Sequence, residues 1–144
     1  MDQALIERLE RSFKLLAPRG QELVDRFYAK LFSENRSVRK MFPEDMAGQK
    51  RKLLASLIFV VQNLRKPDQM VGPLHEMGSR HLEYGTQAEH YPIVRDTMVA
   101  VMADVAGDAW NDQLTADWTA ALNVVAGIML EGAKATTVAA GVRT

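Results

Sequence analysis

Three histidines, His75, His81 and His90, carry most of the chemistry that this 144-residue sequence offers, and the chain contains no cysteine. A neutral imidazole can donate an electron pair to a metal. A closed structural zinc site is not expected, because such sites use cysteine. The sequence also lacks a glycine-rich phosphate loop, a G-x-S-x-G nucleophile motif and an H-E-x-x-H zinc pair. The search for a site therefore centres on histidine.

Among the three, His81 has the most distinctive surroundings. By helical spacing it shares one face with Leu74, Met77 and Gly78. Gly78 and Gly85 have no side chains to cover that face, so a flat molecule could approach the backbone there. The alternative is a partly buried histidine that donates a hydrogen bond to a carbonyl group. For a lone histidine that alternative is the commoner one.

Five other side chains could have either a structural role or a role in a site. Tyr28 is either a core tyrosine with its hydroxyl at the rim or a hydroxyl donor aimed into a cavity. Gln49 suits an exposed helix start, and Lys52 suits a solvated helix face. Phe42 is expected to plug the core, and Trp118 is expected to anchor packing. None of these residues identifies a site alone.

Helices are expected to position these residues, because apolar side chains recur at three- and four-residue spacing. Asp2 is a candidate N-cap, Gly85 marks a break, and Pro92 suits a first helical turn. No segment alternates with period two. The segments expected to be helical are 2–16, 23–32, a short piece at 37–42, 46–65, 68–82, 91–105, and 111 to beyond 134.

The composition narrows the class of protein further. The length fits one domain over residues 1–144, with 136–144 expected to be a C-terminal tail or the start of a linker. Eighteen basic residues balance eighteen acidic ones, which argues against nucleic-acid or membrane partners. The absence of cysteine, of a signal peptide in MDQALIERLERSF and of a membrane-length apolar run favours the cytoplasm.

Four motifs resemble those of one known family. Over residues 3–132 the sequence resembles bacterial single-domain haemoglobins and the globin domain of flavohaemoglobins. HYPIV, which follows RH closely, is the most specific of the matches. The motifs are RFYAKLFSENRSVRKMF at 26–42, QKRKLL at 49–54, MGSRH at 77–81 and HYPIV at 90–94. The resemblance implies an all-α globin fold of about six main helices and a short one, packed around haem b.

On the proximal side, the resemblance makes His81 the ligand of the haem iron. It makes Tyr91 the tyrosine that supports this histidine, and Trp118 a core residue of the last helix. An imidazole binds iron best when its other ring nitrogen is held by a hydrogen bond. Backbone carbonyls near the end of the preceding helix and the Tyr91 hydroxyl are available for that bond, and Gly85 turns the chain so that Tyr91 can return toward His81.

On the distal side, the resemblance matches Tyr28 and Gln49 to hydrogen-bond donors for a bound ligand. Leu53 lies one turn after Gln49, Phe42 packs on the haem face, and Lys52 could reach a haem propionate. Bound O2 carries partial negative charge, so such donors should slow its release more than that of CO. No histidine lies on the expected distal helix, which argues against a bis-histidyl haem.

One position departs from the family pattern. Flavohaemoglobins place a glutamate on the last helix, in a relay through the tyrosine to the proximal histidine. Counting from Trp118, that place is held here by Ala133. Glu131 is two residues away, which is about 200° around a helix. The sequence therefore argues against strong peroxidase-like character.

The sequence is compatible with three functions. The first is a haem protein that reversibly binds O2, NO and CO, with NO dioxygenase activity when an external reductase is supplied. The second is a haem-based gas sensor that acts on a partner or an output domain. The third is a haem-free helical interaction module. A monomer or a weak homodimer is expected.

Overall fold

Within residues 1–143, the apolar stripes of the sequence fold into six α-helices and three short 3₁₀ helices. The computed structural model describes residues 1–143, with the side chains of residues 1–82 and 84–135. In chain order the elements are α1 (Gln3–Leu16), η1 (Ala17–Arg19), α2 (Gly20–Glu34), η2 (Arg36–Met41), α3 (Ala47–Gln62), α4 (Asp68–Glu83), α5 (His90–Ala106), η3 (Gly107–Ala109) and α6 (Asp112–Arg143).

These elements confirm the predicted all-α fold. No strand occurs among residues 1–143, and none of the helices described there is long and apolar enough to cross a membrane. Asp2 caps α1 as predicted, since its carboxylate accepts a hydrogen bond from the Leu5 amide at 2.8 Å. Pro92 lies in the first turn of α5, also as predicted. The prediction of a tail or linker at 136–144 remains a prediction, and residue 144 lies outside the described part.

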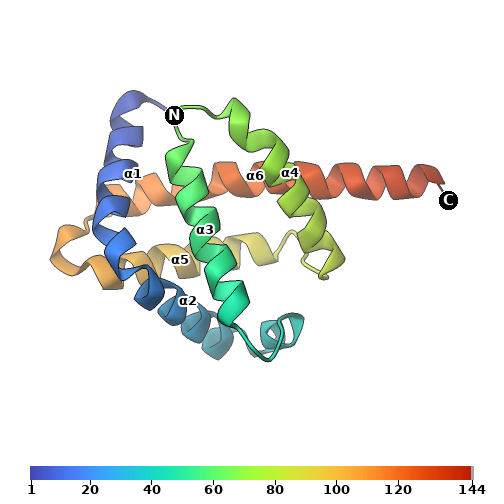
Figure 1. Cartoon of the computed structure of the whole chain (residues 1–144), viewed down its shortest axis with the longest axis horizontal. Coiled ribbons are helices and arrows are strands. Elements are labelled where there is room, and N and C mark those ends of the chain that lie inside the picture. Colours follow the sequence, from blue (N-terminus) through green and yellow to red (C-terminus); the bar gives the residue numbers. More distant parts are fainter. Residues whose placement is uncertain (144) are drawn as a thin grey trace.

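Helix α6 is the long element against which several others pack. Figure 1 shows it running across the molecule, with α1 at one end and α4 crossing it near its middle. Helix α3 crosses in front of α5 and α6 at a steep angle. The core between the helices is closely filled, and its completely buried side chains include Leu9, Leu16, Leu23, Leu74 and Met102. This arrangement puts α3 and α4, which carry most of the predicted site, on one side of α6.

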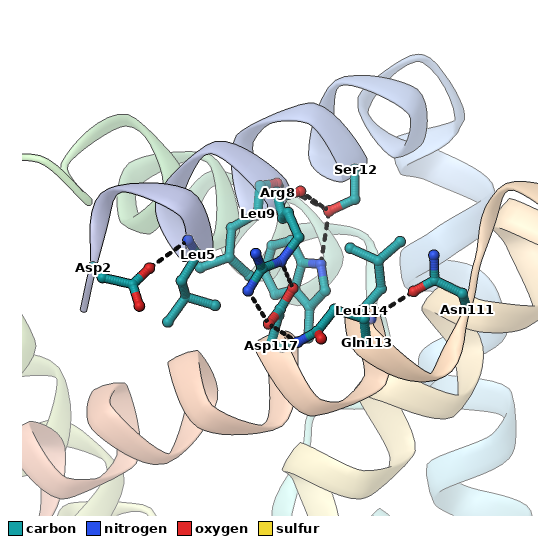
Figure 2. Close-up of polar contacts among 10 residues, drawn as sticks. Asp2, Leu5, Arg8, Leu9, Ser12, Asn111, Gln113, Leu114 and Asp117 are labelled. Atoms are coloured by element: carbon teal, nitrogen blue, oxygen red, sulfur yellow. Dashed lines mark hydrogen bonds and ion pairs between the residues drawn. The ribbon is translucent and has the colours of Figure 1, made fainter.

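Polar side chains fasten α1 to the first half of α6 (Figure 2). Arg8 donates two hydrogen bonds to the carboxylate of Asp117, at 2.6 and 3.0 Å, and Gln113 donates a third at 2.9 Å. The indole nitrogen of Trp118 donates to the Ser12 hydroxyl at 2.9 Å. Trp118 is 1% exposed, which confirms its predicted role as a packing anchor. Side-chain hydrogen bonds therefore hold α1 against the first half of α6.

Candidate functional site

His81 lies near the end of α4, with its ring held by the backbone of its own helix. The distance from its Nδ1 atom to the carbonyl oxygen of Met77 is 2.7 Å. Because a carbonyl only accepts hydrogen bonds, Nδ1 must carry the proton. In the neutral ring, the Nε2 atom then keeps its lone pair, which is the form that binds a metal. The sequence left two interpretations of His81 open. The bond to the carbonyl is the one expected of a partly buried histidine, and the role of His81 as a metal ligand remains a prediction.

The protonation state of His81 favours the same role. Burial lowers the pKa of its ring below the ordinary value of 6.5. The bond to the Met77 carbonyl acts in the opposite direction, and the nearby positive charge of Arg80 lowers the pKa further. Because burial dominates, the imidazole is neutral at pH 7. A neutral ring can coordinate a metal without first losing a proton.

The end of α4 is fixed by a Schellman motif directly after His81. Gly85 has φ +88°, a left-handed conformation that favours glycine. The amide of Thr86 donates to the carbonyl of His81 at 3.0 Å, and the amide of Gly85 donates to that of Leu82 at 3.0 Å. The predicted break at Gly85 is thus a defined helix cap. His81 is held through both its ring and its main chain.

The expected role of Gly78 was wrong. The sequence suggested that Gly78 leaves room for a flat molecule beside His81. Instead, Gly78 faces α6, where an added methyl group would overlap the backbone carbonyl of Met129. The sequence pattern identified the small residue correctly but could not show which element fills the space above it.

Tyr28 and Gln49 meet, although they are on different helices. Tyr28 is on α2, and its side chain is 4% exposed. The side-chain amide nitrogen of Gln49, in the first turn of α3, donates to the Tyr28 hydroxyl oxygen at 3.2 Å. The hydroxyl proton of Tyr28 therefore remains available for another acceptor. Burial raises the pKa of Tyr28 above 10, and the Gln49 bond offsets this only partly, so the phenol stays protonated at neutral pH.

Phe42 completes an aromatic cluster around Tyr28. The ring centroid of Phe42 is 5.7 Å from that of Tyr28 and 5.3 Å from that of Phe32, both in edge-on geometry. Phe32 is itself 5.6 Å from Tyr28. Phe42 follows η2 directly and has extended backbone geometry. The predicted distal residues Tyr28, Gln49 and Phe42 are therefore gathered in one place by α2, η2 and α3.

Arg39 holds this cluster in place and was not identified from the sequence. Its guanidinium donates to the carbonyls of Phe42, Pro43 and Glu44 at 3.3, 2.9 and 3.1 Å. The same group lies 5.0 Å from the ring centroid of Phe32, a cation–π distance. No sequence pattern predicts these contacts, because a lone arginine before a loop is normally solvated.

Leu53 and Lys52 lie on α3 one turn after Gln49. Leu53 is partly buried against the core, whereas Lys52 is exposed. A shallow surface hollow of about 230 Å³ lies between this helix and α4, and Met77 and Arg80 are among its lining residues. Its lining residues are Ala55, Ser56, Phe59, Pro73, Glu76, Met77 and Arg80. None of the predicted site residues is among those that line this hollow.

Tyr91 is less closely tied to His81 than expected. No hydrogen bond joins the two side chains among the residues that the structure describes, and the His81 Nδ1 atom is already bonded to Met77. Tyr91 is half-buried, and this burial raises the pKa of its hydroxyl. It lines a hollow of about 300 Å³ between α5 and α6, together with Arg95 and Asn123. The supporting role of Tyr91 remains a prediction.

Glu131 contacts a different histidine. Its carboxylate lies 3.4 Å from the Nε2 atom of His75 on the surface of the α4–α6 crossing. The side chain of Glu131 is 73% exposed, and that of His75 is 38% exposed. This position agrees with the argument that Glu131 cannot replace the missing glutamate at Ala133.

The chain is similar to known proteins along most of its length. The model of the globin family matches residues 25–129. A flavohemoprotein of Rhizobium meliloti is 25% identical over 118 residues, which are 80% of this chain and 29% of that protein. A flavohemoprotein of Bacillus subtilis is 26% identical over 131 residues, 88% of this chain and 32% of that protein. The chain thus spans about a third of the length of these curated relatives.

Solved structures show the same fold at low identity. A bacterial globin from Campylobacter jejuni superposes with a TM-score of 0.82 at 19% identity, covering 92% of this chain and 96% of that one. A hexacoordinated heme protein from an anhydrobiotic tardigrade gives 0.81 at 17% identity, covering 93% and 96%. These likenesses establish the arrangement of the helices.

Proposed function

Because this chain belongs to the globin family, we propose that it is a haem protein that reversibly binds O2, NO and CO. His81 is the proposed axial ligand, and the cofactor is haem b, because a chain without cysteine has no thiol for covalent attachment. A bound haem would supply an iron with one position open to a small ligand.

The observation that carries this proposal is the hydrogen bond from His81 Nδ1 to the Met77 carbonyl. It fixes the tautomer that presents Nε2, and it restrains rotation of the ring. The lowered pKa of His81 keeps the ring neutral at pH 7.

The distal residues support preferential binding of polar ligands. Gln49 donates to the oxygen of Tyr28, which directs the protonated Tyr28 hydroxyl to a further acceptor. A small ligand with partial negative charge is such an acceptor. One such hydrogen bond is worth about 0.5–1.5 kcal/mol net, or roughly a two- to twelvefold slower release of the ligand. Phe42 and Leu53 are the proposed apolar contacts of the haem, and Lys52 the proposed contact of a propionate.

An NO dioxygenase reaction is the finer form of this proposal. The support is the similarity to flavohemoproteins, of which this chain covers about a third. Conversion of NO and O2 to nitrate needs electrons for each further turnover, so a separate reductase is the proposed partner. Ala133 at the position of the relay glutamate argues for ligand binding over strong peroxidase-like chemistry.

Sensing is the second candidate, and one observation favours it. Helix α6, which contacts α4 beside His81, continues without a break to Arg143. Figure 1 shows that its far end extends beyond the other helices. A helix that contacts the site and also projects from the domain suits transmission of a signal to a partner.

Absorption spectra test the proposal. The purified protein should show a Soret band that shifts on reduction and again on addition of CO. The His81→Ala variant should lose the histidine-ligated spectrum, whereas His75→Ala, on the same helix, should keep it. A wild-type spectrum in His81→Ala, or no Soret band in the wild type after haem is added, would refute the assignment.

Ligand kinetics test the distal residues. Tyr28→Phe removes the hydroxyl but keeps the ring against Phe42. We expect the O2 dissociation rate to rise by about two- to twelvefold, because one hydrogen bond is lost. The CO dissociation rate should change less. Equal changes for both ligands, measured by stopped flow, would exclude Tyr28 as a donor to the ligand.

A further inference from the structure

Helices α4 and α6 cross with their backbones in contact, beside the candidate axial ligand. A methyl group on Gly78 would overlap the carbonyl group and Cα atom of Met129. A methyl group on Gly132 would likewise overlap the backbone of His75. Glycine at both positions is therefore required for this crossing. The contact involves no flexible side chain that could move aside.

A hydrogen bond reinforces the same crossing. The hydroxyl of Ser79 donates to the carbonyl of Gly132 at 3.1 Å. Ser79 follows Gly78 directly, so one short stretch of α4 is held against one turn of α6 by both close packing and a polar bond. Gly78 and Met129 are buried, which keeps water out of the contact.

A single peptide group connects this crossing to the hydrogen bond of His81. The carbonyl that accepts the His81 Nδ1 proton belongs to Met77, and it forms the peptide bond with Gly78. Whatever fixes Gly78 against Met129 therefore also fixes the position of that acceptor. A hydrogen bond of 2.7 Å weakens steeply when its acceptor moves or tilts.

We propose that Gly78 and Gly132 are positioning residues for His81, and that the α4–α6 crossing sets the orientation of its ring. The inference rests on the proposed function, in which His81 binds the haem iron. Helix α6 thereby becomes a second determinant of the iron–histidine bond, through a backbone contact. A displacement of α6 along or away from α4 would be transmitted to the axial ligand through the Met77–Gly78 peptide.

The test compares glycine variants on the haem-loaded protein. Gly78→Ala and Gly132→Ala each add one methyl group at the crossing. Gly127→Ala is the matched control, because it adds the same group to α6 where no neighbour lies within 4 Å. The measurements are the iron–histidine stretching band in resonance Raman spectra of the ferrous protein and the CO association rate.

We expect both crossing variants to shift the iron–histidine band and to change the CO association rate by about two- to tenfold, the range set by weakening one hydrogen bond. Gly127→Ala should match the wild type. Asp117→Ala provides a second control, because it weakens the other end of α6 and should leave the band unchanged. If Gly78→Ala and Gly132→Ala keep the wild-type band and rate, the inference is wrong.

If the glycine variants do not fold, Ser79→Ala tests whether the α4–α6 crossing orients His81. It adds no atom and removes only the hydroxyl bonded to Gly132. A band shift in Ser79→Ala supports the inference, and an unchanged band overturns it. Failure of the proposed function looks different, because the wild type and Gly127→Ala would then lack a His81-dependent haem spectrum altogether.

Discussion

The two halves of α6 are fastened to their neighbours by opposite means. At the first half, Asp117 and Trp118 bind α1 through side-chain hydrogen bonds to Arg8 and Ser12 (Figure 2). At the second half, Gly132 contacts α4 through its backbone alone. The first attachment depends on side chains, of which Arg8 is long and partly exposed, and it is at the opposite half of α6 from the contact with α4. The second brings backbone atoms into direct contact, with the Ser79 hydroxyl adding one side-chain hydrogen bond, and it lies beside His81.

The difference shows how one helix can serve both stability and positioning. Side-chain bonds can be lost one at a time, and each loss has a limited cost. A backbone contact admits no additional atom, so a single methyl group must move a whole helix. A precise ligand position is therefore better supported by the second kind of contact.

The largest expected effect on stability comes from adding a methyl group at the second half of α6, where Gly132 contacts α4. Gly132→Ala should lower the free energy of unfolding by about 1–3 kcal/mol or more, because the methyl group meets the His75 backbone. Gly127→Ala should instead raise it by roughly 0.5–1 kcal/mol, because alanine is the better helix former and the space is open. Urea unfolding followed by circular dichroism measures both. Equal effects would show that the crossing is not tight.

Removing the Asp117 carboxylate, at the first half of α6, should have a smaller effect on stability. Its carboxylate accepts hydrogen bonds from Arg8 and Gln113, and the residue is 3% exposed. We expect Asp117→Ala to lower the free energy of unfolding by about 2 kcal/mol. Asp104→Ala, an exposed site on α5, should change it by roughly 0.5 kcal/mol or less. An Asp117→Ala protein as stable as the control would show that this network is dispensable.

The same carboxylate should make stability depend on pH. The hydrogen bond from Arg8 holds the pKa of Asp117 below its ordinary value of 3.8. A carboxylate with a lowered folded-state pKa stabilises the fold above its unfolded pKa and loses this effect as pH falls through the folded one. The difference in unfolding free energy between wild type and Asp117→Asn should therefore shrink as pH falls from 6 to 3, roughly the range around the unfolded value. A constant difference would exclude this ionisation as its source.

The smallest effect on stability is expected for the side-chain pair at the surface of the α4–α6 crossing. The imidazole of His75 and the carboxylate of Glu131 are 3.4 Å apart and accessible to solvent. Such exposed pairs contribute little, so His75→Gln should change the unfolding free energy by roughly 0.5 kcal/mol or less. A much larger loss would mean that side chains, and not only the backbone, hold α4 to α6.

Much of the fold could be predicted from the sequence, because helical periodicity and caps are local properties. Asp2, Pro92 and the Gly85 break all lie where the pattern placed them. The His81–Met77 bond is also local, since residues four apart share a helix face. Arg39 was missed because its acceptors belong to an irregular loop, whose path has no signature in sequence.

The sequence by itself determined the helices, the family motifs and the histidine whose ring can turn back onto its own helix. Only the tertiary structure decided what lies against each helix face. It brings the Tyr28 hydroxyl to Gln49, which is 21 residues away, and it places Met129 over Gly78, where the sequence suggested open space. The physical reason is that spacing along a helix defines a face, whereas the neighbour of that face depends on how distant elements share the core.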